Sequence, residues 1–190
     1  MKFYESGDNR KPVIFLFPGT CCLYSSFDHV LAGLHSYFYT VTVSYDGFDP
    51  NEKTEFYSME DECEKIEQEI RKKYGGRIYL VAKIQSSMVV PFMYKMVHTG
   101  TLPKFVQKKL DKTDGGKKEL YNGFLNMFGI GKGGSPWITK QSIYNQFYSD
   151  LVTKVQHGID VPGTTIHVFY ATKMGEKYEK RYCTYFKNPD

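Results

Sequence analysis

The sequence predicts an α/β fold in which helices flank a mostly parallel sheet. The segment 13–17, Val-Ile-Phe-Leu-Phe, is continuously apolar, as is typical of a strand that is covered on both faces. Strand-like and helix-like segments then alternate along the chain, at lengths that suit right-handed crossovers between parallel strands. The length of 190 residues fits one domain, with or without an inserted lobe, and is enough to bury a core.

Apolar patterning and turn residues define the expected elements before residue 82. Residues 1–11 are polar and are expected to form a lead-in without regular structure. Pro18-Gly19 ends the first strand, and Asp46-Gly47 is a turn signal. Ser58 is suited to cap a helix, because its hydroxyl can accept a hydrogen bond from a free amide of the first turn. The expected order is a strand over 13–17, a helix over 27–38, a strand over 39–45, a helix over 58–73 and a strand over 77–81.

The pattern changes to a block of helices after residue 81. Apolar residues recur at helical spacing in four segments, and Pro91 implies a kink in the first of them. A strand and a terminal helix follow, so that three strands precede the helical block and one strand comes after it. The expected helices cover 82–97, 102–110, 120–128 and 142–155, and the last two elements are a strand over 164–171 and a helix over 176–186.

Charge and composition exclude several classes of function. The net charge is +4, and the lysines are spread among acids, which indicates a solvated surface rather than a nucleic-acid-binding face. No apolar run reaches the ~18 residues of a transmembrane segment, and the polar N-terminus is not expected to be a signal peptide. The four cysteines lack metal-ligand spacing. They predict free thiols in a cytoplasmic protein, and no metal or cofactor is expected.

Four stretches, which occur in the same order in a known family, carry a resemblance that spans most of the chain. They are Phe15-Leu-Phe-Pro-Gly-Thr-Cys-Cys22, Val43-Ser-Tyr-Asp-Gly-Phe-Asp49, Asn145-Gln-Phe-Tyr-Ser-Asp-Leu-Val152 and the segment 161–178. The layout resembles an α/β-hydrolase in which a helical cap is inserted into the sheet sequence. It is most similar to bacterial hydrolases of that fold.

The resemblance implies a three-layer α/β-hydrolase-like fold with a shortened sheet. Residues 1–81 and 160–190 would form the α/β core, and residues 82–159 the helical cap or lid, within a single structural domain. Relatives in this family cleave carboxylic esters or related acyl bonds through a serine nucleophile. The resemblance places Gly19, Thr20 and Cys21 in the loop that supplies one arm of the oxyanion hole.

The resemblance breaks at the family's central motif, a Gly-x-Ser-x-Gly elbow after the third of these strands. The glycines are needed because the serine sits on a strained turn between strand and helix. This chain has Leu80-Val-Ala-Lys-Ile-Gln-Ser-Ser-Met88 there, without a glycine. Either substitutions degraded the elbow, or a deletion removed it together with its helix and the next strand. We favour a deletion, because residues 82–100 resemble the helix that enters the family's cap.

The other two members of the family's triad also lack a match. The acid follows the strand that 164–171 resembles, where Asp160 and Glu176 are the nearby carboxylates. The histidine follows one further strand, and the sequence stops at Asp190 before any such strand. A triad acts through three roles together, so the resemblance implies that no intact Ser-His-Asp triad is present and that the machinery is incomplete.

Two kinds of side chain are weak candidates for a replacement nucleophile. Ser86, with its neighbour Ser87, carries the hydroxyl nearest to the absent elbow and would need an adjacent base. Cys21 or Cys22 offers a thiol in a loop that is expected to have free amides. The structural alternatives are serines that cap or cover a helix, and small buried thiols.

Three functional hypotheses stay open on these observations. The chain is a hydrolase-family pseudoenzyme that has lost its machinery, or a binding module that uses the old pocket and the cap for a small acyl or aromatic ligand or a protein partner. The third hypothesis is hydrolysis by unconventional residues such as Ser86 or Cys21. A shortened sheet exposes its edges, so we also expect self-association into a homo-oligomer.

Overall fold

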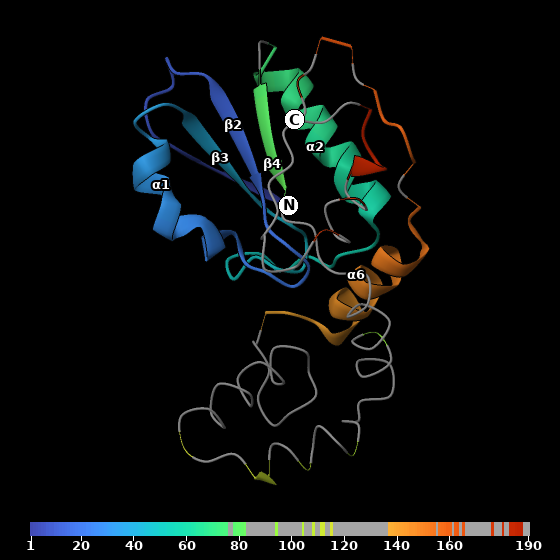
Figure 1. Cartoon of the computed structure of the whole chain (residues 1–190). Coiled ribbons are helices and arrows are strands. Elements are labelled where there is room, and N and C mark those ends of the chain that lie inside the picture. Colours follow the sequence, from blue (N-terminus) through green and yellow to red (C-terminus); the bar gives the residue numbers. More distant parts are fainter. Residues whose placement is uncertain are drawn as a thin grey trace. The chain divides into compact units, whose positions relative to one another are not determined.

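The architecture is seen in a computed structural model of the chain (Figure 1). The chain divides into two compact units, Met1–Val152 and Thr153–Asp190, and each is described by itself. The structure describes residues 1–75, 78–82, 137–154, 156–160 and 183–187, and the single positions 94, 104, 108, 111, 112, 115, 162, 163, 165, 176 and 180.

The first unit is built on a four-stranded sheet, and the predicted α/β class is confirmed. The strand order is β1-β3-β2-β4, and β2 pairs in parallel with both β3 and β4. Three of the four strands are therefore parallel, which confirms the mostly parallel sheet. The bounds are β1 Lys2–Ser6, β2 Val13–Phe17, β3 Tyr39–Ser44 and β4 Ile78–Ala82.

The expected lead-in over residues 1–11 is wrong, because β1 lies within it. This strand pairs antiparallel with β3, from Lys2 opposite Ser44 to Ser6 opposite Thr40. Phe3 packs against the core, and the ring of Tyr4 stacks on that of Tyr24 with 4.0 Å between the centroids. Charged and polar residues are common on an edge strand, and here they hid the strand from a search for apolar runs.

The helices of the first unit begin close to the expected positions but differ in length. Ser58 caps α2 (Met59–Lys73), because its hydroxyl accepts the Asp61 amide at 3.2 Å, as predicted. The helix expected over 27–38 is instead a 3-10 turn, η1 (Tyr24–Phe27), followed by α1 (Asp28–Leu34). The helix expected over 142–155 is α6 (Lys140–Val152), and Thr139 holds its first turn through a bond from the Ser142 amide to its hydroxyl.

The core of this unit combines the sheet with α6. Apolar side chains of the parallel strands, of the segment after β3 and of α6 form one buried cluster. It includes Phe15, Val41, Val43, Phe48, Phe56, Ile143 and Phe147. The buried strand over 13–17 and the β-branched strand that follows α1 are therefore central, as their sequences predicted.

Several expected elements lie outside the described residues, apart from single positions and residues 183–186, and stay predictions. They are the helices over 82–97, 102–110 and 120–128, the strand over 164–171 and the helix over 176–186. The boundaries of the expected cap, residues 82–159, depend on the same region. In the second unit, Ile159 forms a parallel bridge with Phe186, and the rings of His157 and Tyr185 lie 5.3 Å apart.

The turn at Gly47 gives a prediction about the packing of α6. Gly47 has a φ of +76°, and a Cβ there would lie 2.2 Å from Ser142 Oγ and 2.9 Å from the Phe56 amide nitrogen. Gly47→Ala is expected to lower the free energy of unfolding by about 2–4 kcal/mol, because it combines backbone strain with overpacking. Urea unfolding followed by circular dichroism measures this loss.

Gly33→Ala is the matched control for this substitution. Gly33 lies in α1 and has no atom within 4 Å of a built Cβ, so alanine is expected to be neutral or to stabilise the helix. Equal effects of the two substitutions would contradict the tight approach of Gly47 to α6.

Candidate functional site

The loop after β2 is the candidate site, and it lies at the carboxyl end of the parallel strands. This is the end where α/β folds bind their ligands. The Cys22 amide donates to the Gly19 carbonyl oxygen at 2.9 Å, which closes a tight turn. Cys21 has a φ of +56°, in the left-handed region that residues other than glycine rarely adopt. The loop therefore holds a strained backbone conformation at the position expected for an oxyanion hole.

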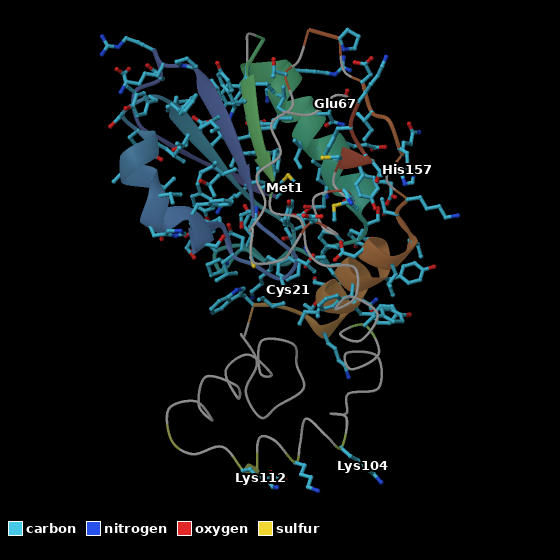
Figure 2. All side chains as sticks on the ribbon, in the orientation of Figure 1. Met1, Cys21, Glu67, Lys104, Lys112 and His157 are labelled. Atoms are coloured by element: carbon cyan, nitrogen blue, oxygen red, sulfur yellow. The ribbon has the colours of Figure 1, made fainter. Side chains whose placement is uncertain are left out.

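The amide of Cys21, a residue labelled in Figure 2, is engaged within the chain. It donates to the side-chain oxygen Oε1 of Gln146 on α6 at a distance of 2.7 Å. Both residues are buried, at 2% and 1% exposure. The expectation of a free amide is therefore not met at Cys21, because the carbonyl oxygen of a side chain occupies the position where a ligand oxygen would accept.

A second contact joins the same loop to the same helix. The Thr20 hydroxyl donates to Asp150 Oδ2 at 2.7 Å. Burial raises the pKa of the Asp150 carboxyl, and the bond from Thr20 opposes this change. Gln146 and Asp150 are four residues apart, so they lie on one face of α6 and reach neighbouring residues of the loop.

The structure disfavours the Cys21 thiol as a nucleophile. Burial raises the pKa of this thiol well above its usual range, and the nearby Asp150 carboxylate acts in the same direction. The reactive form of cysteine is the thiolate, which such an environment makes rare at neutral pH. The geometry thus fits a small buried thiol better than an activated one.

The remaining candidates lie outside the described residues or in the second unit. Ser86 and Ser87 lie outside the described residues, so their roles stay predictions. Glu176 is exposed and belongs to the second unit. Asp160 is also in that unit, where its carboxylate pairs with the Lys187 ammonium at 3.0 Å.

The sequence reasoning missed Gln146 and Asp150 as partners of the loop. A signal was available, because both lie within the stretch 145–152 that carries the family resemblance. Gln146 also interrupts an apolar pair, Ile143 and Phe147, on the buried side of the helix. A polar residue in such a place needs a hydrogen-bond partner, and the partner here is the loop.

Three carboxylates, one after β3 and two on α2, form a cluster. Asp46, Asp61 and Glu62 place ligand atoms within 4.8 Å of one another. The Lys65 ammonium offsets part of their charge, at 2.5 Å from Asp46 Oδ2 and 3.4 Å from Glu62 Oε1, and it also pairs with Asp61. Glu62 Oε2 accepts the amide of Asp46 at 3.1 Å. We assign this cluster a structural role, because a lysine already pairs with all three carboxylates.

An open groove lies at the opposite end of the strands, where β2, β3 and β4 begin. The hydroxyls of Tyr39 and Tyr74 donate to the Glu5 carboxylate at 2.7 and 2.5 Å, and the Lys73 ammonium lies 3.3 Å from it. These groups satisfy one another, which indicates a structural polar network. The groove is lined by Glu5, Asn9, Val13, Tyr39, Lys73, Tyr74, Gly75 and Ile78.

Among the described residues, no helix combines the length and the apolar character needed to cross a bilayer.

The contact between Gln146 and the loop gives a prediction about stability. Gln146→Met keeps a similar volume but removes the acceptor, so the buried Cys21 amide loses its partner. We expect a loss of about 1–3 kcal/mol in the free energy of unfolding. Gln141→Met on the same helix is the control, because Gln141 is exposed and bonds only to Asn145 among the described contacts. Equal losses in the two variants would contradict the structural role of Gln146.

The buried carboxylate of Glu62 gives a prediction about pH. Burial raises the pKa of Glu62 to about 6, so folding favours its protonated form. The stability that the protonated carboxyl contributes is complete below about pH 4.5, the pKa of this group in the unfolded chain. It is lost as the pH rises through about 6, the pKa in the folded chain. Glu62→Gln is therefore expected to be more stable than the parent chain by roughly 1–2 kcal/mol at pH 8, with the difference vanishing near pH 4.

Urea unfolding across this pH range measures the difference, and Glu67→Gln is the control. Glu67 lies on α2 (Figure 2), and its exposed carboxylate pairs with Arg71. If the Glu62 variant were no more stable than the parent at pH 8, this result would contradict the expectation that the buried Glu62 carboxylate lowers the free energy of unfolding.

Comparison with known proteins finds similar solved structures. No family model and no curated protein sequence matches the chain. Solved structures of similar shape include a protein described as belonging to the α/β-hydrolase family, from Desulfitobacterium hafniense, with 11% identity and a TM-score of 0.48. The match covers 78% of this chain and 71% of that one. A hydrolase from Pseudomonas aeruginosa PA01 has 12% identity and a TM-score of 0.47, over 80% of this chain and 69% of that chain.

A third structure is alike in fold at a TM-score of 0.50. It is 1H-3-hydroxy-4-oxoquinoline 2,4-dioxygenase, with 16% identity, and the match covers 78% of this chain and 66% of the dioxygenase. The likeness is one of fold and not of activity, since these proteins carry out different chemistry. The chain has an α/β fold with a four-stranded sheet in its described part, and this fold is like that of the dioxygenase.

Proposed function

We propose that this chain is related to hydrolases of carboxylic esters or similar acyl bonds, and that as written it lacks the machinery for serine hydrolysis. The observation that carries the proposal is the hydrogen bond from the Cys21 amide to Gln146. An oxyanion hole works through amides that point at the position where charge develops. Here that donor is directed at a side chain of the same chain.

The sequence after β4 supports the same proposal. In the hydrolase family, the residue after this strand opens the elbow that holds the serine, and glycines flank it. The chain continues from Ala82 as Lys-Ile-Gln-Ser-Ser, without a glycine. The raised pKa of the Cys21 thiol, caused first by burial, argues against a thiol that takes over the role.

The second candidate function is a non-catalytic binding or interaction module. It would use the cap and the residual pocket for a small acyl or aromatic ligand, or present them to a protein partner. A cluster of tyrosines on α6 favours this candidate. Tyr144 and Tyr148 stack with 6.4 Å between their ring centroids, and the ring of Tyr94 lies 5.3 Å from that of Tyr144. Tyr148 is 49% exposed, so part of an aromatic surface is open to a ligand.

Labelling with a fluorophosphonate probe tests the proposal. The purified chain is expected to show no heat-sensitive labelling, because an unactivated serine does not react with such a probe. The positive control is a hydrolase of the same fold that keeps its Gly-x-Ser-x-Gly elbow, treated in parallel. Mass spectrometry identifies any modified residue. Specific labelling of one serine in the folded chain, lost on heating, would overturn the proposal and restore a hydrolase function.

A further inference from the structure

Two tyrosine rings stack where the candidate loop ends. Tyr4 lies on β1, and Tyr24 is the first residue of η1, which follows the loop along the chain. The ring centroids lie 4.0 Å apart, with 13° between the ring planes. At this separation the ring carbons are in van der Waals contact. By comparison, the tyrosine pairs that involve α6 have centroids 5.3 to 6.4 Å apart.

The Tyr4 hydroxyl is paired with a buried carboxylate. It donates to Asp49 Oδ2 at 2.7 Å, and Asp49 is 1% exposed. The Asn51 side chain donates to the same hydroxyl at 3.3 Å, and the Asn51 amide donates to Asp49 Oδ1 at 2.8 Å. Burial acts in the opposite direction, but the hydrogen bonds from Tyr4 and Asn51 lower the pKa of Asp49, so this carboxylate is ionised at neutral pH. A base at hydrogen-bond distance is thus in place to take the phenolic proton.

Oxidation of a phenol by one electron is coupled to the loss of its proton. Burial, together with the hydrogen bond to Asp49, raises the pKa of Tyr4 to about 12, so the phenol is protonated at neutral pH. Its radical cation, in contrast, is a strong acid and gives the proton to a base at hydrogen-bond distance. Asp49 is such a base, so Tyr4 is suited to form a neutral radical in contact with a second ring.

We propose that Tyr4 and Tyr24 form a modification site, at which hydrogen peroxide and a haem peroxidase couple the two rings into a dityrosine cross-link. The peroxidase takes one electron from each ring, and the phenolic protons leave to Asp49 and to solvent. A bond then forms between two ring carbons ortho to the hydroxyls, and the hydrogens on those carbons move to the phenolic oxygens. One hydrogen peroxide is reduced to two waters, and the chain loses two hydrogen atoms. The cross-link ties β1 to the turn that follows the candidate loop.

Treatment of the purified chain with a haem peroxidase and hydrogen peroxide tests the proposal. At low protein concentration, the single chain is expected to gain dityrosine fluorescence and to lose the mass of two hydrogen atoms. Mass spectrometry of a tryptic digest is expected to show the peptide 3–10, in which Tyr4 is the single tyrosine, joined to the peptide that contains Tyr24. A chain with neither the mass loss nor this joined peptide would overturn the proposal.

Tyr24→Phe keeps the stacked ring but removes the hydroxyl that coupling requires, so it is expected to abolish the joined peptide. Tyr37→Phe is the matched control, because Tyr37 is 72% exposed and lies in the turn after α1. Its yield of joined peptide is expected to equal that of the parent chain. A joined peptide that persists in Tyr24→Phe, or a cross-link that forms between other tyrosines only, would place the coupling elsewhere and overturn the proposal.

Asp49→Asn tests the role of the base. The amide keeps the shape of the side chain but cannot take the phenolic proton, so coupling is expected to slow by about 10²-fold, the lower end of what a positioned base contributes. An unchanged circular dichroism spectrum shows that the variant is folded. A folded Asp49→Asn chain that couples at the rate of the parent would overturn the assignment of Asp49 as the base.

Discussion

The contact between α6 and the carboxyl end of the sheet is the constraint on which the first unit depends. Gln146 and Asp150 bond to loop residues that lie 125 and 130 positions earlier in the chain. Ser142 accepts the Phe56 amide, and Asn145 donates to the Phe56 carbonyl. Because the loop-closure entropy of such distant contacts must be offset by burial, the polar bonds form together with the packing of Ile143 and Phe147.

The elements that could be predicted are those whose formation depends on residues close together in the sequence. The apolar run over 13–17 and the β-branched run over 39–45 gave two central strands, because both need cover on two faces. Ser58 was identified as a cap, since capping uses residues only three positions apart. In contrast, β1 was missed. Its formation depends on pairing with Tyr39–Ser44, and no feature within residues 1–11 encodes that partner.

The same distinction holds for the candidate site. The position of the loop at the end of β2 followed from the Pro-Gly that ends the strand, whereas the role of Gly19, Thr20 and Cys21 in an oxyanion hole stays a prediction. The engagement of this loop by α6 was not found, because it depends on tertiary packing that brings a helix from the other end of the unit. A buried glutamine at helical spacing from apolar residues indicates that a partner exists, but not which one.

The Cys21 amide cannot donate fully to Gln146 and to a ligand at the same time. A ligand oxygen that took the Cys21 amide would have to displace the buried oxygen of Gln146. The side-chain oxygen of Gln146 would then be buried without a donor, which costs about 1–3 kcal/mol that the ligand would have to offset before it gained any affinity. If the chain lacks serine hydrolysis, as we propose, it has no such reaction that requires a free amide in this loop. The bond from Cys21 to Gln146 stabilises this part of the fold and occupies a donor that an oxyanion hole would use.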